Sequence, residues 1–379
     1  MIKLCVPDIT QAEQDAVCDA LRSGWLAHGP YNKQFEAAFA DYVGVDHALT
    51  CNSCTSALFA VLKALGIRGE VIIPSFSFTA TANAVLTAGA VPRFVDIDAA
   101  TCNVDPECMR DAITPKTEAI MVVHFGGQCC QMDAITAIAR EHGLHLIEDS
   151  AETLGGTFKG AQAGSFGIGC FSFFPTKNIT TGEGGMITTN DATLAKELKA
   201  LLAHGMDSTT YQREKSEMPW FRSAVLPGYN FRMSNMLAAL GCEQMKRLDE
   251  LNQSRQHHAA HLIERLAGIP QLSLPATDPD CNHVYQMFTV RLSEGMDRTR
   301  FVRRLNELGV GASVHFYPPI HEQVYYRDHP EWCADSLAVT ESVSRQIVTL
   351  PMYPGLKDDE VETIADAVKT AIEEQATAE

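Results

Sequence analysis

Between residues 70 and 150 the chain alternates short apolar runs with helical segments, and this alternation constrains the fold more than any other feature. The runs read as buried strands because both of their faces are apolar. They are residues 70–74, 92–96, 119–124 and 144–148, with helical spacing at 79–88 and 132–142. Strands joined through helices require right-handed crossovers. The sequence therefore predicts an α/β protein with a mostly parallel sheet covered on both faces.

The pattern changes in the second half of the chain. Residues 166–174 are rich in aromatic residues and glycine, and 182–189 has the composition of a turn entering a strand. One long helix is predicted over 234–266. After it we expect strands at 283–292 and 311–316 and helices at 298–308 and 357–374. This predicts a large domain over 1–250 and a smaller α+β domain over 251–379.

Charge and apolar patterning exclude two classes of partner. The chain has 30 Lys and Arg against 47 Asp and Glu, a net charge of −17, and so would repel a nucleic-acid backbone. No apolar run reaches the roughly 20 residues that cross a bilayer. The first residues also lack a basic stretch followed by an apolar one, which a secretory signal would show. We expect a cytoplasmic protein without membrane or nucleic-acid partners.

The twelve cysteines are spread from Cys5 to Cys333 and are expected to be reduced thiols. Cys51 and Cys54 have the C-x-x-C spacing of zinc and redox sites. No second pair or histidine motif follows at a suitable distance, so no metal site is predicted.

Two residues carry most of the chemical information. Asp149 ends the apolar run of residues 144–148, where ligands of a parallel sheet collect, although a helix N-cap explains an aspartate there equally well. Lys177 lies in the segment FSFFPTKNITTGEGG, between aromatic residues and glycines. A partly desolvated lysine can present a neutral amine for Schiff-base chemistry. A carboxylate that protonates a pyridine nitrogen and a lysine that forms an imine are the pair that pyridoxal phosphate (PLP) requires.

The same cofactor needs a phosphate site and a group over its ring. Ser53, Cys54 and Thr55 precede a helical run at 57–65, which places hydroxyls and main-chain amides at a helix N-terminus. Phe78 follows the run of residues 70–74 and suits ring stacking, although an aromatic residue there is more often part of the core.

Eight segments between residues 24 and 356 resemble, in order, the signature segments of the DegT/StrS-type nucleotide-sugar aminotransferases. They are GWLAHGPYNKQFE, CNSCTSALFAVL, IPSFSFTATANAVL, VHFGGQCCQMDAI, EDSAETLG, FSFFPTKNITTGEGGM, GYNFRMSNMLAALG and LPMYPGL. The resemblance implies the type I aminotransferase fold, with a mostly parallel seven-stranded sheet, a smaller C-terminal domain, and a homodimer with its active sites at the interface.

Residue roles follow from the resemblance. It implies that Lys177 forms the Schiff base and carries protons, that Asp149 pairs with the pyridine nitrogen, and that Phe78 stacks on the ring. The phosphate cradle would comprise Ser53, Thr55 and Ser172, completed by Asn230 of the neighbouring subunit.

Three residues depart from the family pattern. Cys54 stands where a small residue is usual, Glu152 where Gln or His commonly touches the cofactor's phenolic oxygen, and Phe174 where His is frequent. A carboxylate at 152 disfavours a nearby phenolate unless it is protonated or turned toward substrate. Glu152 and Phe174 together favour a 4-keto-6-deoxy sugar nucleotide.

Three further residues are candidates for substrate contacts. His315 and His321 fall where the family's small domain approaches the sugar nucleotide, and loop histidines explain them as well. Arg232 suits a phosphate or carboxylate, and an interface ion pair is an equal alternative.

The predicted activity is a PLP-dependent amino transfer from glutamate to a keto-sugar nucleotide in amino-sugar biosynthesis. Amination of a cyclitol or another non-nucleotide ketone is an alternative. A sugar dehydratase of the same fold would carry His in place of Lys177, and a non-catalytic regulator would not need the Asp149 and Lys177 pair. A nicotinamide enzyme would want a G-x-G-x-x-G motif, which is absent.

Overall fold

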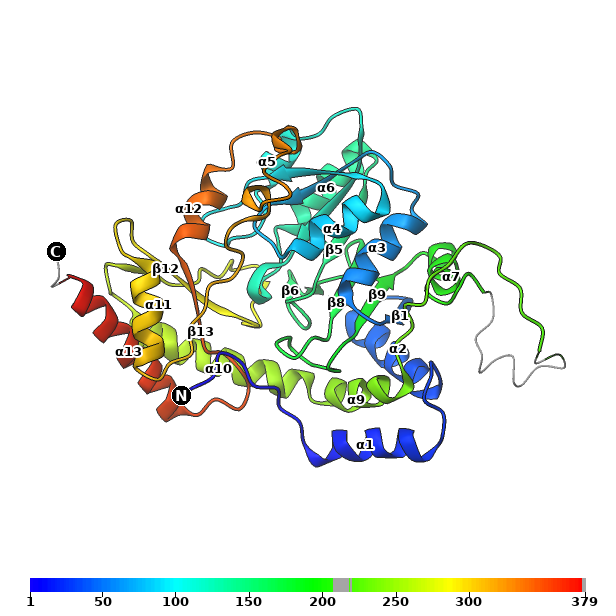
Figure 1. Cartoon of the computed structure of the whole chain (residues 1–379), viewed down its shortest axis with the longest axis horizontal. Helices are drawn as coiled ribbons and strands as arrows, with labels where there is room; N and C mark the ends of the chain where they lie inside the picture. Colours follow the sequence, from blue (N-terminus) through cyan, green and yellow to red (C-terminus); the bar gives the residue numbers. More distant parts are fainter. Residues whose placement is uncertain (207–217, 219, 377–379) are drawn as a thin grey trace.

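The computed structural model describes residues 1–206, 218 and 220–376 (Figure 1). The α-helices are α1 (Gln11–Arg22), α2 (Pro30–Val43), α3 (Cys54–Ala64), α4 (Thr79–Ala88), α5 (Pro106–Asp111), α6 (Met132–His142), α7 (Ala192–Leu201), α9 (Asn235–Lys246), α10 (Leu248–Leu266), α11 (Arg298–Glu307), α12 (Ala338–Gln346) and α13 (Asp358–Ala376). The strands are β1 (His47–Cys51), β2 (Glu70–Pro74), β3 (Val91–Val95), β4 (Thr117–Val123), β5 (His145–Asp149), β6 (Thr157–Phe158), β7 (Ala161–Gln162), β8 (Ile168–Ser172), β9 (Gly185–Thr189), β10 (Leu272–Ser273), β11 (Cys281–Asn282), β12 (Phe288–Leu292) and β13 (Ile347–Leu350).

A seven-stranded sheet forms the centre of the molecule, in the order β1-β9-β8-β5-β4-β2-β3. Only β9 runs antiparallel to its neighbours; β3, β2, β4, β5 and β8 pair in parallel. The predicted mostly parallel sheet is therefore confirmed, and the apolar runs at 70–74, 92–96, 119–124 and 144–148 all form strands within one or two residues of the predicted ends.

Helices cover both faces of this sheet, which explains why its strands are apolar throughout. Along β4, Ala119 and Met121 pack toward α3, α4 and α7, whereas Ile120 and Val122 pack toward α6. At the other end of the sheet, α2 and α9 cover the second face through a cluster that includes Phe39 and Phe171. Successive strand residues thus enter different cores, as the twofold period of a strand requires.

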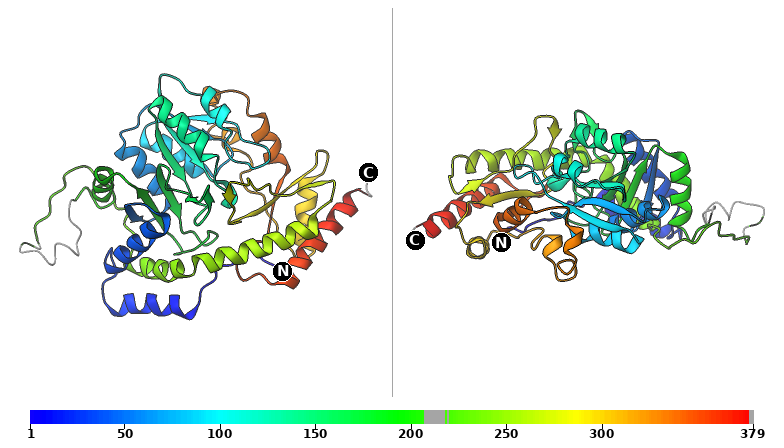
Figure 2. Two further views of the ribbon diagram at one scale, coloured as in Figure 1. Left: turned by 180° about the vertical axis from the view of Figure 1, so that it is seen from behind. Right: turned by 90° about the horizontal axis from the view of Figure 1, so that it is seen from above.

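A second hydrophobic cluster belongs to the C-terminal part of the chain. It lies around the antiparallel sheet β10-β12-β13 and the helices α10, α11 and α13, which Figure 2 shows at one end of the molecule. The N-terminal residues also pack there, since Ile2 pairs with Val310 and Val6 contacts the cluster. The division of the chain near residue 250 remains a prediction.

Three predictions about the second half of the chain were wrong in detail. The helix expected over 234–266 is two helices, because the main chain turns at Arg247 (φ −107°, ψ 0°). The strand expected over 283–292 begins only at Phe288, after Tyr285 with a φ of +43°. Residues 311–316 form no strand; only Ser313 bridges to Thr349, and Phe316 has a φ of +58°. Neither positive φ is compatible with an extended strand.

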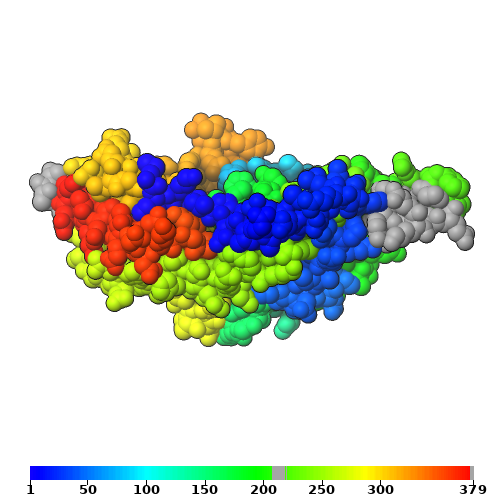
Figure 3. All heavy atoms as spheres, turned by 90° about the horizontal axis from the view of Figure 1, so that it is seen from below, coloured from blue at the N-terminus to red at the C-terminus, as the bar shows by residue number. Residues whose placement is uncertain are grey.

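Figure 3 shows α1 lying along α9 on one face of the molecule, and a buried carboxylate fixes this contact. Glu13 of α1 is fully buried and accepts hydrogen bonds from the Thr10 main-chain amide, from Gln244 Nε2 (2.8 Å) and from Arg247 Nη1 (3.1 Å). Burial by itself raises the pKa of Glu13, but the hydrogen bonds from Thr10 and Gln244 outweigh it and lower the pKa to about 2.

A Glu13→Gln variant should therefore be less stable by about 2 kcal/mol at neutral pH. Because the folded-state pKa lies below the usual 4.5, this stabilisation is present above pH 4.5 and is lost as the pH falls toward 2. Urea unfolding at pH 7 and pH 3 measures both effects. Asp19→Asn, in an exposed ion pair on the same helix, is the control and should change stability by less than about 0.5 kcal/mol. An equal loss from Glu13→Gln at both pH values would contradict the prediction.

Within the described residues, no helix is both long enough and apolar enough to cross a membrane.

Candidate active site

A cavity of about 440 Å³ opens at the carboxyl ends of β4, β5 and β8. Val123, Asp149 and Ser172 line it from these strand ends, where open parallel sheets bind their ligands. Its opposite wall comes from the N-terminal segment and from residues near β13. Nine of the twelve predicted site residues line the cavity: Ser53, Cys54, Thr55, Phe78, Asp149, Glu152, Ser172, Lys177 and His315.

Asp149 is the last residue of β5, and its side chain is 6% exposed. Oδ2 accepts a hydrogen bond from Thr81 Oγ1 (2.9 Å), while Oδ1 accepts one from the Ala151 amide (3.3 Å) and lies 3.8 Å from Cys54 Sγ. Burial raises the pKa of Asp149, and the hydrogen bonds from Thr81 and Ala151 oppose that effect. Asp149 forms no ion pair within the described chain. A buried carboxylate of this kind is stabilised by a cationic partner in the cavity.

Lys177 reaches the cavity from the turn that follows β8. Its Nζ lies 3.2 Å from Glu152 Oε1, and the two side chains are 17% and 8% exposed. Glu152 Oε2 accepts a hydrogen bond from the amide of Gly126 (3.0 Å), which holds the carboxylate in place. Lys177 and Glu152 therefore form a nearly buried ion pair beside Asp149.

The N-terminus of α3 forms one end of the cavity. Ser53 is the N-cap and accepts a hydrogen bond from the Ser56 amide (3.1 Å), while Thr55 in the first turn is exposed. The first amides of a helix have no intrahelical acceptor, so this end suits an anion. Gly185 of β9 allows the approach, because a Cβ there would lie 2.5 Å from the Ser53 carbonyl carbon. Ser172 lies at the end of β8 and lines the same cavity.

Phe78 and Phe174 line the cavity with unusually exposed rings, 67% and 46%. Large apolar side chains cost free energy in water, so a ligand that covers them would be stabilised. The alternative that Phe78 belongs to the core does not hold in the described structure.

The two closely spaced cysteines behave as packed thiols. Burial raises the pKa of Cys51 to about 12 and also raises that of Cys54, so neither is a thiolate at neutral pH.

The three remaining candidates lie outside the cavity. His321 Nδ1 is 2.7 Å from Ser75 Oγ, next to β2. Asn230 is exposed, and its Oδ1 accepts a hydrogen bond from Arg232 Nε (2.9 Å). Arg232 Nη2 also lies 3.3 Å from His204 Nε2. The chain therefore does not bring these residues to its own cavity. His315, by contrast, does line it, with Nδ1 2.7 Å from Thr349 Oγ1, and burial lowers its pKa.

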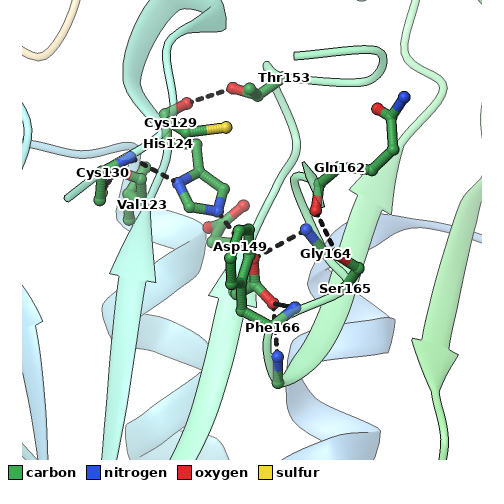
Figure 4. A network of polar contacts seen from close by, with 12 residues as sticks. Val123, His124, Cys129, Cys130, Asp149, Thr153, Gln162, Gly164, Ser165 and Phe166 are labelled. Atoms are coloured by element: carbon green, nitrogen blue, oxygen red, sulfur yellow. Dashed lines mark hydrogen bonds and ion pairs between the residues drawn. The ribbon is translucent and has the colours of Figure 1, made fainter. Parts of the chain in front are cut away.

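A largely buried network of polar contacts lies at the ends of β4 and β5 (Figure 4). Glu148 of β5 accepts hydrogen bonds from His124 Nε2 and from the amides of Gly164, Phe166 and Gly167, at 2.7–3.1 Å. The Cys130 amide donates to His124 Nδ1 (3.1 Å), which assigns the ring proton to Nε2. The His124 amide also bonds to the carbonyl of Asp149 (3.1 Å), so the network fixes the main chain at Asp149.

Three site residues were not predicted from the sequence. Thr81 holds Asp149, and its place three residues after Phe78, on the first turn of α4, is a signal that would have identified it. Gln286 and Arg255 contact the main chain near Lys177 and carry no local signal, because they are far from it in sequence.

The residues present fit PLP. The cavity is within the usual size for such a ligand. It combines an anion site at a helix N-terminus, a buried carboxylate that forms no ion pair with any described residue, a lysine and an exposed aromatic ring.

Comparison with known proteins agrees with a PLP site. Residues 7–369 match the model of the DegT/DnrJ/EryC1/StrS aminotransferase family. The chain is 39% identical to the spore coat polysaccharide biosynthesis protein SpsC of Bacillus subtilis, over 97% of this chain and 96% of that protein. It is 38% identical to the GDP-perosamine synthase of Caulobacter vibrioides, over 97% of both chains.

Solved structures give the same result. The sugar aminotransferase Spr1654 of Streptococcus pneumoniae, described as putative and solved in its PMP form, superposes with a TM-score of 0.92 at 29% identity, covering 99% of this chain and 100% of that one. The predicted type I aminotransferase fold and PLP dependence are therefore confirmed.

Proposed function

Because this chain belongs to the DegT/DnrJ/EryC1/StrS family of PLP-dependent sugar aminotransferases, we propose that it transfers an amino group from glutamate to a 4-keto-6-deoxy sugar nucleotide. The single observation that carries the cofactor chemistry is the cavity in which Asp149, Lys177 and the N-terminus of α3 converge. In the overall reaction, the amino group of glutamate replaces the carbonyl oxygen of the sugar, and glutamate becomes 2-oxoglutarate.

Six of the residues that line the cavity have a role in this proposal. When bound, PLP supplies an aldehyde that takes up amino groups and a ring that withdraws electrons from the reacting carbon. Asp149 keeps a proton on the ring nitrogen, and Lys177 Nζ moves a proton at the reacting carbon. Phe78 covers one face of the ring and excludes water there. Ser53, Thr55 and Ser172 hold the phosphate together with the first amides of α3.

Two features support a 6-deoxy sugar as the acceptor. One relative is a GDP-perosamine synthase, 38% identical over 97% of both chains. The exposed ring of Phe174 offers the cavity an apolar surface, which suits a methyl group better than a hydroxymethyl group. His315 offers a separate substrate contact: burial lowers its pKa, so its imidazole is neutral near pH 7 and can accept a hydrogen bond from a sugar hydroxyl.

A substrate screen tests this proposal. The purified protein should be yellow, and glutamate should remove the colour. Keto-sugar nucleotides are then incubated with the protein and glutamate, with a cyclitol ketone in parallel, and the products are identified by mass spectrometry. Amination of a 4-keto-6-deoxy sugar nucleotide is the expected result. Amination of the cyclitol alone, or a protein that does not acquire colour with added PLP, would refute it.

We also propose a homodimer in which Asn230 completes the phosphate site of the neighbouring subunit. In support, Asn230 is exposed and lies outside the cavity of its own chain. The described residues 220–225 belong to a segment that extends from the body of the molecule (Figure 1). The exposed apolar side chains of this region are Met218, Trp220, Phe221 and Val225. Exposed apolar groups of this kind commonly mark subunit contacts.

Mixing two inactive variants tests this arrangement. Lys177→Ala and Asn230→Ala subunits, unfolded and refolded together, should regain about a quarter of wild-type activity, because half of the dimers are mixed and each contains one intact site. The assay is run at low PLP, where the loss of a phosphate contact limits activity. Recovery should be absent when Lys177→Ala is mixed with Asp149→Asn, which lies in the same chain's cavity. No recovery in the first mixture, or full cofactor affinity of Asn230→Ala, would contradict the proposal.

A further inference from the structure

The turn that carries Lys177 is held by two side chains from much later in the sequence. Gln286 Nε2 donates a hydrogen bond to the main-chain carbonyl of Thr176 (2.7 Å). Arg255 Nη2 donates to the carbonyl of Lys177 itself (3.1 Å). Both side chains are deeply buried, with 4% and 3% exposure. Two consecutive carbonyl groups are therefore held by side chains from different elements.

Arg255 occupies this position at an energetic cost. Its guanidinium forms no ion pair with any described residue, and its Nε has no hydrogen-bond partner there. Burial lowers its pKa to about 10. The guanidinium also donates a hydrogen bond from Nη1 to the carbonyl of Leu251, one turn earlier on α10 (3.3 Å). An apolar side chain of similar volume would avoid the cost of burying this charge, so packing alone does not explain an arginine here.

These contacts determine the direction of the lysine side chain. Peptide groups are planar, so fixing the carbonyls of residues 176 and 177 fixes the peptide planes on both sides of the Lys177 Cα. The Lys177 amide is also bound, to the carbonyl of Phe174 (2.9 Å). The Cα–Cβ bond then has one direction, which leads Nζ into the cavity beside Glu152.

We propose that Arg255 and Gln286 are positioning residues that hold the main chain of Thr176 and Lys177, so that Lys177 Nζ meets the carbonyl carbon of the cofactor. The proposal rests on the proposed role of Lys177. Arg255 does not line the cavity, so it acts only through the main chain. Gln286 does line the cavity, so replacing it also changes the cavity wall. The Arg255 variants therefore test the positioning role more directly.

The test compares two ligands that differ only in whether they can bond to Lys177. Pyridoxal phosphate forms a Schiff base with an amine, and pyridoxamine phosphate cannot. Their affinities are measured on the cofactor-free protein, by visible absorbance and by calorimetry. The variants are Arg255→Met and Gln286→Leu, with Arg255→Lys and Gln286→His, which keep an N–H donor. Two variants are the matched controls. Arg265→Met removes another arginine of the same helix, and Gln256→Leu removes a donor to the carbonyl of His283.

Arg255→Met and Gln286→Leu should each weaken pyridoxal phosphate binding about tenfold and lower kcat by a similar factor. Pyridoxamine phosphate affinity should change less than about twofold for Arg255→Met, because the phosphate and ring contacts are intact. Arg255→Lys and Gln286→His should recover part of the loss, and the controls should match the wild type.

The outcomes separate this inference from the proposed function. The positioning role would be overturned if Arg255→Met lost affinity equally for pyridoxal phosphate and pyridoxamine phosphate. It would also be overturned if Arg255→Met bound pyridoxal phosphate with wild-type affinity. If Arg255→Met does not fold, Gln286→Leu takes its place, and wild-type affinity of Gln286→Leu for pyridoxal phosphate would overturn the positioning role. If the wild-type protein binds pyridoxal phosphate without the yellow band, the proposed role of Lys177 is refuted, independently of the results for the Arg255 and Gln286 variants.

Discussion

Replacing Lys177 with alanine is expected to reduce amino transfer by on the order of 10⁴-fold. The lysine is the basic side chain that the described structure brings to the cavity with its nitrogen next to Glu152, 3.2 Å away. In the proposed function, its removal takes away both the amine that bonds to PLP and the group that moves the proton. The measurement is kcat with glutamate, together with the visible spectrum of the protein, which should lose its yellow band.

Two controls identify the chemical origin of this loss. Lys177→Arg keeps the positive charge beside Glu152 but has no nucleophilic amine, and it should be nearly as inactive as the alanine variant. Lys196→Ala, an exposed lysine of α7, should behave as the wild type. More than a few per cent of wild-type activity in Lys177→Ala would show that another group moves the proton.

Replacing Asp149 with asparagine is expected to lower kcat by between about 10² and 10³. An amide has nearly the same shape but no charge, so it cannot hold a proton on the ring nitrogen of the cofactor. The side chain is 6% exposed, and its electrostatic effect is therefore only weakly screened by water. Steady-state kinetics at saturating PLP separate this loss from weaker cofactor binding.

Thr81→Val is the matched test of how Asp149 is held. It removes the hydroxyl that lies 2.9 Å from Asp149 Oδ2 and keeps the size of the side chain. We expect a smaller loss of kcat, about tenfold, since the Ala151 amide still donates to the other carboxylate oxygen. If Thr81→Val lost as much activity as Asp149→Asn, the hydrogen bond from the Thr81 hydroxyl, and not the charge of Asp149, would account for the loss of kcat.

The strand and helix order of residues 70–150 could be predicted because each strand there is buried on both faces and so carries an uninterrupted apolar run. The same reasoning located Asp149, since it follows such a run. Lys177 was recognisable from its surroundings, a basic residue among aromatic residues and glycines. These features are local in sequence, and each has one dominant physical cause.

The features that could not be predicted depend on contacts between distant residues. The break between α9 and α10 occurs at Arg247, whose side chain bonds to Asp8 and Glu13 from the start of the chain, while the helical pattern continues through it. Arg255 and Gln286 lie 78 and 110 residues from the carbonyl groups that they hold. Neither a propensity nor a local motif carries that information.

The placement of the first residues has a practical consequence for purification and labelling. Leu4 and Cys5 line the cavity, and Ile2 pairs with Val310, so the chain enters the molecule beside its active site. A tag joined to Met1 would emerge only a few residues from the cavity wall and compete with ligands for that space. An affinity handle or fluorophore therefore belongs away from Met1.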